Sequence, residues 1–127
     1  MNIEHLKEET VLYVEDDAAI MQSFSKILKK VFGDVKTAIN GKEGLEVFKA
    51  SKDISFVITD IKMPKMDGLE MAKEIKAISP NTPFILTTAH GEYDYFLRAD
   101  EVGVYRYIQK PINVNELLQA LSEYEQN

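Results

Sequence analysis

Short apolar segments alternate with longer amphipathic segments along the chain. The apolar segments are rich in β-branched and aromatic residues and have the length of strands. Several are apolar almost throughout, as strands covered on both faces are. We therefore predict five strands, at Thr10–Val14, Val35–Ala38, Ile54–Thr59, Phe84–Thr88 and Val104–Ile108.

The segments between these strands carry apolar residues at helical spacing. Three are well marked, and they lie at Ala18–Val31, Met71–Ile78 and Val114–Leu121. Two weaker ones cover Gly41–Ser51 and Tyr93–Val102. Asn113, with Glu116 three residues later, has the form of a capping box, which predicts that the last helix begins there.

Five strands alternating with five helices predict an α/β fold with a parallel sheet and right-handed crossovers. The 127 residues are close to the commonest domain size, so we expect one domain over residues 1–127.

Composition narrows the possible functions. The net charge of −6 argues against nucleic-acid or anionic-membrane binding by this domain. The chain has no cysteine, which excludes disulfides and thiolate chemistry. It has no apolar run of about 18 residues and no secretory signal at its start, so we expect a cytoplasmic protein.

Charged and polar residues follow the predicted strands. Glu15–Asp17 follow the first strand, Asp60 the third and Lys110 the fifth, while Thr88 ends the fourth. Strands of a parallel sheet end at one edge, where ligands bind, so these side chains should meet. Two carboxylates about 4 Å apart repel by roughly 4 kcal/mol at an effective dielectric constant near 20. One lysine does not neutralise three acids, so the group needs a trapped proton or a cation such as Mg²⁺.

Each of these residues also has a purely structural interpretation. Glu15–Asp17 would only stabilise the helix that begins near Ala18, because negative charges interact favourably with the positive end of the helix dipole. Asp60 would lie in a surface turn, and Thr88 would be an ordinary strand residue. Lys110 would be a solvated charge. Their combined position at the strand ends favours the functional interpretation.

These residues resemble the response-regulator receiver domain, the phosphoacceptor part of two-component signalling, in a chemotaxis-regulator-like form. The segment Glu15–Asp17 resembles the family's acidic pair, and "DIKMPKMDG" (Asp60–Gly68) resembles its phosphoacceptor loop. "TTA" (Thr87–Ala89) resembles its switch threonine, and "KP" (Lys110–Pro111) its lysine-proline pair. The similarity covers essentially the whole chain. It implies the flavodoxin-like doubly wound sheet of order 2-1-3-4-5 and a cis Lys110–Pro111 bond.

The resemblance also implies residue roles. Asp60 would accept a phosphoryl group, and Asp16 and Asp17 would bind Mg²⁺ together with Asp60 and the backbone carbonyl of Lys62. Mn²⁺ or Ca²⁺ would substitute for Mg²⁺. Lys110 would pair with Asp60 and then with the phosphoryl oxygens.

The remaining implied roles concern the switch and the lifetime of the phosphate. Thr88 would hydrogen-bond the phosphoryl group, and Tyr107, otherwise a core residue, would swing with it. Lys62 and His90 border the path of the attacking water and would tune the lifetime of the phosphate.

The implied function is signalling. The domain would receive its phosphoryl group from a histidine kinase or a histidine phosphotransfer protein. It would catalyse its own phosphorylation and dephosphorylation without being a conventional enzyme. The surface formed by the fourth helix, fifth strand and fifth helix would then act on a C-terminal output domain or a separate target.

Two alternatives remain open. One is an interaction module that works without phosphorylation. The other is a phosphohydrolase that forms an aspartyl-phosphate, but that chemistry needs an acid two residues after the nucleophile, where this chain has Lys62.

Overall fold

A computed structural model of the chain describes residues 2–89 and 102–124. A parallel sheet of five strands forms its centre, in the order β2-β1-β3-β4-β5. The strands are β1 (Thr10–Val14), β2 (Asp34–Ala38), β3 (Ile54–Asp60), β4 (Phe84–Thr88) and β5 (Arg106–Gln109). This flavodoxin-like order confirms the prediction.

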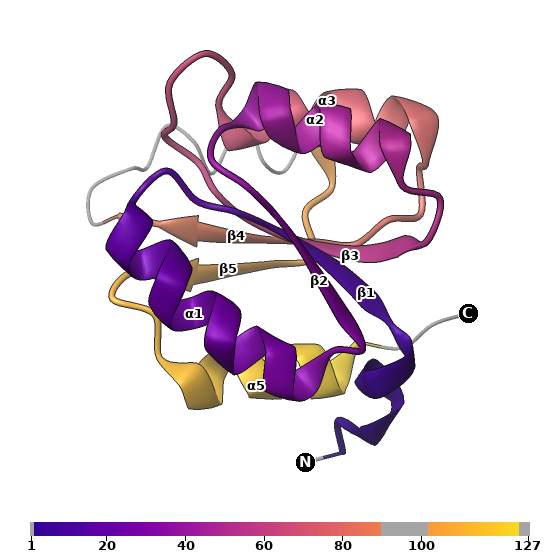
Figure 1. Ribbon diagram of the computed structural model, residues 1–127, viewed down its shortest axis with the longest axis vertical. Coiled ribbons are helices and arrows are strands. Elements are labelled where there is room, and N and C mark those ends of the chain that lie inside the picture. The colour runs from indigo at the N-terminus through magenta and orange to yellow at the C-terminus, as the bar shows by residue number, and fades with distance from the viewer. Residues whose placement is uncertain (1, 90–101, 125–127) are drawn as a thin grey trace.

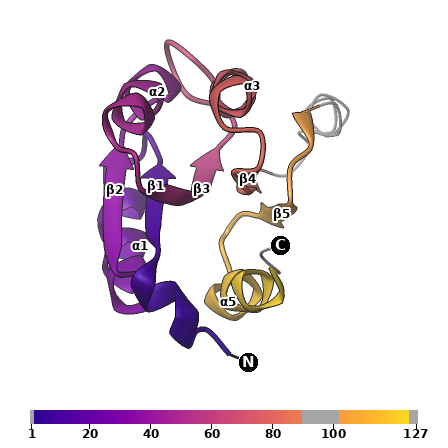
Figure 2. The same ribbon diagram turned by 90° about the vertical axis from the view of Figure 1, so that its right-hand side faces the viewer.

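Helices cover both faces of the sheet (Figure 1). One face carries α1 (Ala18–Val31) and α5 (Val114–Glu123), and the other carries α2 (Gly41–Ala50) and α3 (Gly68–Ile78). The view along the sheet shows the two helical layers with the strands between them (Figure 2). None of the helices in these ranges is long and apolar enough to cross a membrane.

The three central strands β1, β3 and β4 are largely buried because both of their faces pack against helices. Val11, Tyr13 and Phe56 lie in the cluster beneath α1 and α5. Leu12 and Val14 point to the opposite face, into the cluster beneath α2 and α3. This alternation explains why β1 reads as apolar throughout in the sequence.

Side-chain caps fix where the helices begin. Asp17, Asn40, Asp67 and Asn113 are the N-caps of α1, α2, α3 and α5, and each side chain accepts a hydrogen bond from a backbone N–H three residues on. The start of α5 after Asn113 is therefore confirmed, with Glu116 as the donor. Such caps typically stabilise a helix by about 1 kcal/mol.

Two details differ from the sequence prediction, and a third expectation is not covered by the described residues. The fifth strand begins at Arg106 instead of Val104, and the Tyr105 ring just before it packs with Phe56 and Tyr124. A 3-10 helix at Glu4–Glu8, held by the buried Leu6, was not predicted. The expected helix at Tyr93–Val102 falls almost entirely outside the described residues.

The loop after β3 is held close against the end of that strand. The backbone N–H of Gly68 donates to the carbonyl oxygen of Ile61 at 2.7 Å. A Cβ on Gly68 would lie 2.1 Å from the carbonyl oxygen of Asp60, so only glycine fits at this position. The first turn of α3 thereby lies directly against the strand end that carries Asp60.

Candidate functional site

The carboxyl edge of the sheet brings together residues that lie far apart in the sequence. Asp60 is the last residue of β3, Glu15 directly follows β1, and Lys110 directly follows β5. The ladder continues past two of these ends, since Glu15 N–H donates to Ala38 O at 3.1 Å and Lys110 N–H donates to Thr88 O at 2.7 Å. Strand pairing therefore places the three side chains at one edge.

A single ammonium group bridges two buried carboxylates. Lys110 Nζ lies 2.8 Å from Asp60 Oδ2 and 3.2 Å from Glu15 Oε1. The side chains of Asp60 and Glu15 are 10% and 0% exposed, so both ion pairs lie in an environment of low polarity. Backbone groups fix the other oxygens, because Ile61 N–H donates to Asp60 Oδ1 and Asp17 N–H donates to Glu15 Oε2.

The two acids remain incompletely compensated. Burial raises the pKa of the Asp60 carboxyl above its usual value, against the opposing effect of Lys110. Burial also raises the pKa of Glu15, while the backbone of Asp17 and the charge of Lys110 lower it. For Lys110, burial would lower the pKa, but the hydrogen bond and charge of Asp60, with those of Glu15, outweigh burial and raise it.

The acidic group fits a hard cation. Carboxylate oxygens of Glu15, Asp16 and Asp60 lie within 4.8 Å of one another, and Asp16 is exposed while the other two are buried. Mg²⁺ prefers oxygen ligands and commonly uses one or two carboxylates together with water and phosphate. Asp16, the exposed member of the group, connects it to solvent, from which water and phosphate would come.

Asp17 lies differently from the sequence prediction, which paired it with Asp16. Its Oδ1 accepts a hydrogen bond from Ile20 N–H at 3.0 Å and caps α1. Glu15 joins Asp16 and Asp60 instead. One sequence signal favours this arrangement: the last acid before a helix is the preferred N-cap, which leaves the two preceding acids for the strand end.

The other predicted site residues lie at the same edge where they are described. Thr88 ends β4, is 2% exposed, and pairs with Gln109 in the ladder. Tyr107 is half-buried and packs against the cluster of Ile61, Leu69 and Leu86. Lys62 is exposed in the loop after Asp60. The predicted cis Lys110–Pro111 bond is confirmed, while His90 lies outside the described residues.

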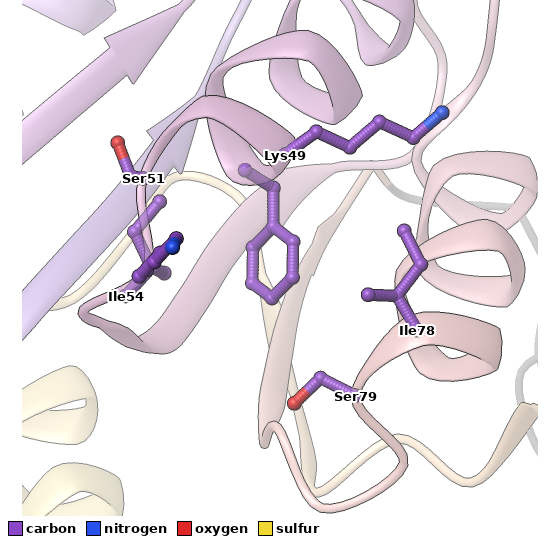
Figure 3. Close-up of a pocket in the computed structure, with 7 residues that line it drawn as sticks. Lys49, Ser51, Ile54, Ile78 and Ser79 are labelled. Carbon is purple, nitrogen blue, oxygen red and sulfur yellow. The ribbon is translucent and has the colours of Figure 1, made fainter.

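A pocket of about 320 Å³ lies at the opposite end of the sheet, where β3 begins. Ile54 and Ile78 face each other across it (Figure 3). Its lining comprises Phe48, Lys49, Ser51, Lys52, Ile54, Ile78 and Ser79. This lining includes no carboxylate, so the candidate metal ligands are those at the C-terminal ends of the strands.

The flavodoxin-like sheet, with acids and a lysine at its carboxyl edge, has the architecture of a receiver domain. The chain matches the response regulator receiver domain family over residues 11–122, and it belongs to that family.

Its curated relatives include larger regulators and one protein of similar size. The transcriptional regulatory protein GlrR of Escherichia coli K12 is 33% identical over 117 residues, which cover 92% of this chain and 26% of GlrR. The chain thus spans about a quarter of that relative's length. Sporulation initiation phosphotransferase F of Bacillus subtilis is 29% identical over 119 residues, which cover 94% of this chain and 95% of that protein.

Solved structures agree with this placement. A response regulator receiver domain protein from Clostridium thermocellum is 34% identical, with a TM-score of 0.83 and coverage of 90% of this chain and 91% of that chain. The N-terminal domain of a Wolinella succinogenes protein is 36% identical, with a TM-score of 0.84 and coverage of 91% and 92%.

The raised pKa of Asp60 predicts how stability depends on pH. The folded state holds the proton of this carboxyl to higher pH than the unfolded state, so the free energy of unfolding falls as the pH rises between the two pKa values. Asp60→Asn should therefore raise the melting temperature at pH 7 in EDTA, and this gain should vanish as the pH falls below about 4.

Melting temperatures of wild type and variant between pH 3 and pH 7 test this. Asp53→Asn, at an exposed carboxylate remote from the site, is the matched control and should leave the curve unchanged. An Asp60→Asn variant that melts below wild type at pH 7 would show that the pair with Lys110 outweighs burial.

Proposed function

We propose that Asp60 accepts a phosphoryl group in a Mg²⁺-dependent reaction and that the resulting phosphoprotein transmits a signal. The observation that carries the proposal is the position of the Asp60 carboxylate, which shares Lys110 with Glu15 and lies beside Asp16. Family membership supports the same reaction.

The reaction joins an Asp60 carboxylate oxygen to the phosphorus atom of the donor. The donor is a phosphohistidine of a histidine kinase or a phosphotransfer protein, so a P–N bond breaks as the P–O bond forms and the histidine nitrogen takes up a proton. The product is an aspartyl-phosphate. Such transfers depend on in-line positioning and charge stabilisation more than on covalent assistance.

Each side chain of the site has a part in this positioning. The bond from Ile61 N–H holds Asp60 Oδ1 and fixes the plane of the carboxylate. Lys110 leaves the carboxylates for the phosphoryl oxygens, where its charge is needed. Glu15 and Asp16, with Asp60 and the carbonyl of Lys62, hold Mg²⁺, which supplies positive charge for the phosphoryl group when it is bound.

The output follows from a rearrangement behind the site. Thr88 moves toward the phosphoryl oxygens, and Tyr107 rotates inward into the space that Thr88 leaves. The surface around β5 and α5 then differs between the two states, and it acts on an output domain or a separate target. This is a shift between two populations, caused by a local change in charge. We assign the reaction to the cytoplasm.

Asp60→Asn should abolish the incorporation of acid-labile phosphate. The amide cannot form an acyl phosphate, whereas wild type should be labelled by acetyl phosphate with Mg²⁺ and not in EDTA. Mass spectrometry of the intact protein measures the added phosphate. Labelling of Asp60→Asn at the wild-type rate would overturn the assignment, and an unlabelled wild type would favour the interaction module.

Mg²⁺ should stabilise the folded protein through Asp16 and not through Asp17. A ligand that binds only the folded state stabilises it by RT ln(1 + [L]/Kd), about 2.7 kcal/mol at 100 times Kd. Asp16→Asn should lose most of the gain in melting temperature on addition of Mg²⁺. Asp17→Asn is the matched control, because asparagine also caps helices well, and it should keep the gain. The reverse result would restore Asp17 as the ligand.

Beryllofluoride, which mimics the phosphoryl group, should reveal the switch. Together with Mg²⁺ it should shift NMR signals at Thr88 and Tyr107 as well as at Asp60 and Lys110. Tyr107→Ala should keep the shifts around Asp60 while losing those along β5. Shifts confined to the acids and Lys110 in wild type would show that Thr88 and Tyr107 are static packing residues.

A further inference from the structure

Within residues 2–89 and 102–124, one buried hydroxyl near the site lacks a hydrogen-bond partner. Tyr13 is the penultimate residue of β1, its side chain is 1% exposed, and its ring packs in the cluster beneath α1 and α5. Among the described residues, nothing accepts a hydrogen bond from its Oη or donates one to it. Buried polar groups are almost always paired, so an unpaired one needs an explanation.

The orientation of β1 places this hydroxyl on the side of Glu15. Side chains two residues apart in a strand share a face, and the ladder bond from Glu15 N–H to Ala38 O extends that alternation to Glu15. Burial, followed by the negative charge of Glu15 and then those of Asp60 and Asp17, raises the pKa of Tyr13. The hydroxyl therefore lies on the same face of β1 as the Glu15 carboxylate.

Glu15 depends on a donor that the proposed reaction removes. Lys110 Nζ donates to Glu15 Oε1 at 3.2 Å and to Asp60 Oδ2 at 2.8 Å. The Glu15 side chain is fully buried, so water does not replace a lost donor directly. When Lys110 turns to the phosphoryl oxygens, Oε1 loses this charge-assisted bond while the carboxylate stays in place.

We propose that Tyr13 is a positioning residue whose hydroxyl donates to the Glu15 carboxylate once Lys110 has moved to the phosphoryl group on Asp60. The inference rests on the proposed function. It accounts for two observations. The Tyr13 hydroxyl is a donor without an acceptor among the described residues, and Glu15 is an acceptor that shares its donor, Lys110, with Asp60. Tyr13 touches neither metal nor phosphoryl group, and it acts through Glu15.

The proposal predicts opposite effects of one substitution in the two states. Tyr13→Phe removes a buried hydroxyl that makes no hydrogen bond within the described part of the chain. The free energy of unfolding in EDTA should therefore be unchanged or raised. In the activated state the same change removes the donor that the proposal assigns to the Glu15 carboxylate beside Mg²⁺. The affinity for beryllofluoride at saturating Mg²⁺ should therefore fall about tenfold, a bond of about 1.4 kcal/mol.

Tyr105→Phe is a matched control within the same chain. The Tyr105 hydroxyl donates to the carbonyl oxygen of Ala120 at 2.7 Å, remote from the carboxyl edge. Its removal should lower the free energy of unfolding and leave the beryllofluoride affinity unchanged. A purely structural tyrosine at position 13 would likewise leave the beryllofluoride affinity unchanged on substitution by phenylalanine.

The experiment measures urea unfolding in EDTA and beryllofluoride titration by NMR for wild type and both variants. In wild type labelled with ¹³C at the tyrosine ζ carbon, the Tyr13 signal should shift when beryllofluoride binds. If Tyr13→Phe binds beryllofluoride as tightly as wild type, or if the Tyr13 signal does not move, the inference is overturned while the proposed function stands. If wild type does not bind beryllofluoride, both fall.

Discussion

The ammonium group of Lys110 is the contact on which the rest of the site depends. It joins β5 to the ends of β3 and β1 through Asp60 and Glu15, which lie 50 and 95 residues away in the sequence. A carboxylate this deeply buried is costly without a partner, and one cation cannot neutralise two. Every other feature of the edge either positions this lysine or leaves room for a second positive charge.

The sheet supplies that position without any long loop. Parallel pairing aligns the ends of β1, β3 and β5, and the bond from Lys110 N–H to Thr88 O continues the β4–β5 ladder up to the lysine itself. Gly68, which lies close to the backbone of Asp60, allows the start of α3 to pack against the same edge. Asp60 ends β3, while Glu15 and Lys110 directly follow β1 and β5, so the strands themselves position these three groups.

Much of this was predictable from the sequence, because the controlling signals are local. Apolar runs gave the strands, and Asn113 gave the start of α5. Parallel topology then placed Asp60 and Lys110 together. The roles of Glu15 and Asp17 were not resolved in this way, since three adjacent acids look alike in a sequence. Their roles separate only when Asp17 caps α1 and Glu15 extends β1.

The start of β5 was misjudged for a different reason. Tyr105 continues a β-branched and aromatic run, but its ring packs edge-on against Phe56 and Tyr124. Its hydroxyl is also tied to Ala120 of α5. The backbone N–H of Tyr105 still donates to Phe84 O of β4, so the boundary is shifted without loss of this contact. A pattern of residue types cannot show this ring packing, because the partners lie in β3 and at the end of α5.

The incompletely compensated charges of Asp60 and Glu15 make the site sensitive to a change in nearby charge. Burial holds the pKa values of Asp60 and Glu15 above their usual range, which means that the folded protein bears an electrostatic cost when both are ionised. A divalent cation would relieve that cost, and a phosphoryl group would draw Lys110 away and renew it at Glu15. The hydroxyl of Tyr13 has no partner among the described residues and lies beneath the site. It is on the face of β1 from which it could donate a hydrogen bond to Glu15. Under the proposed function, stability, metal binding and signalling would therefore be coupled through the same few buried charges.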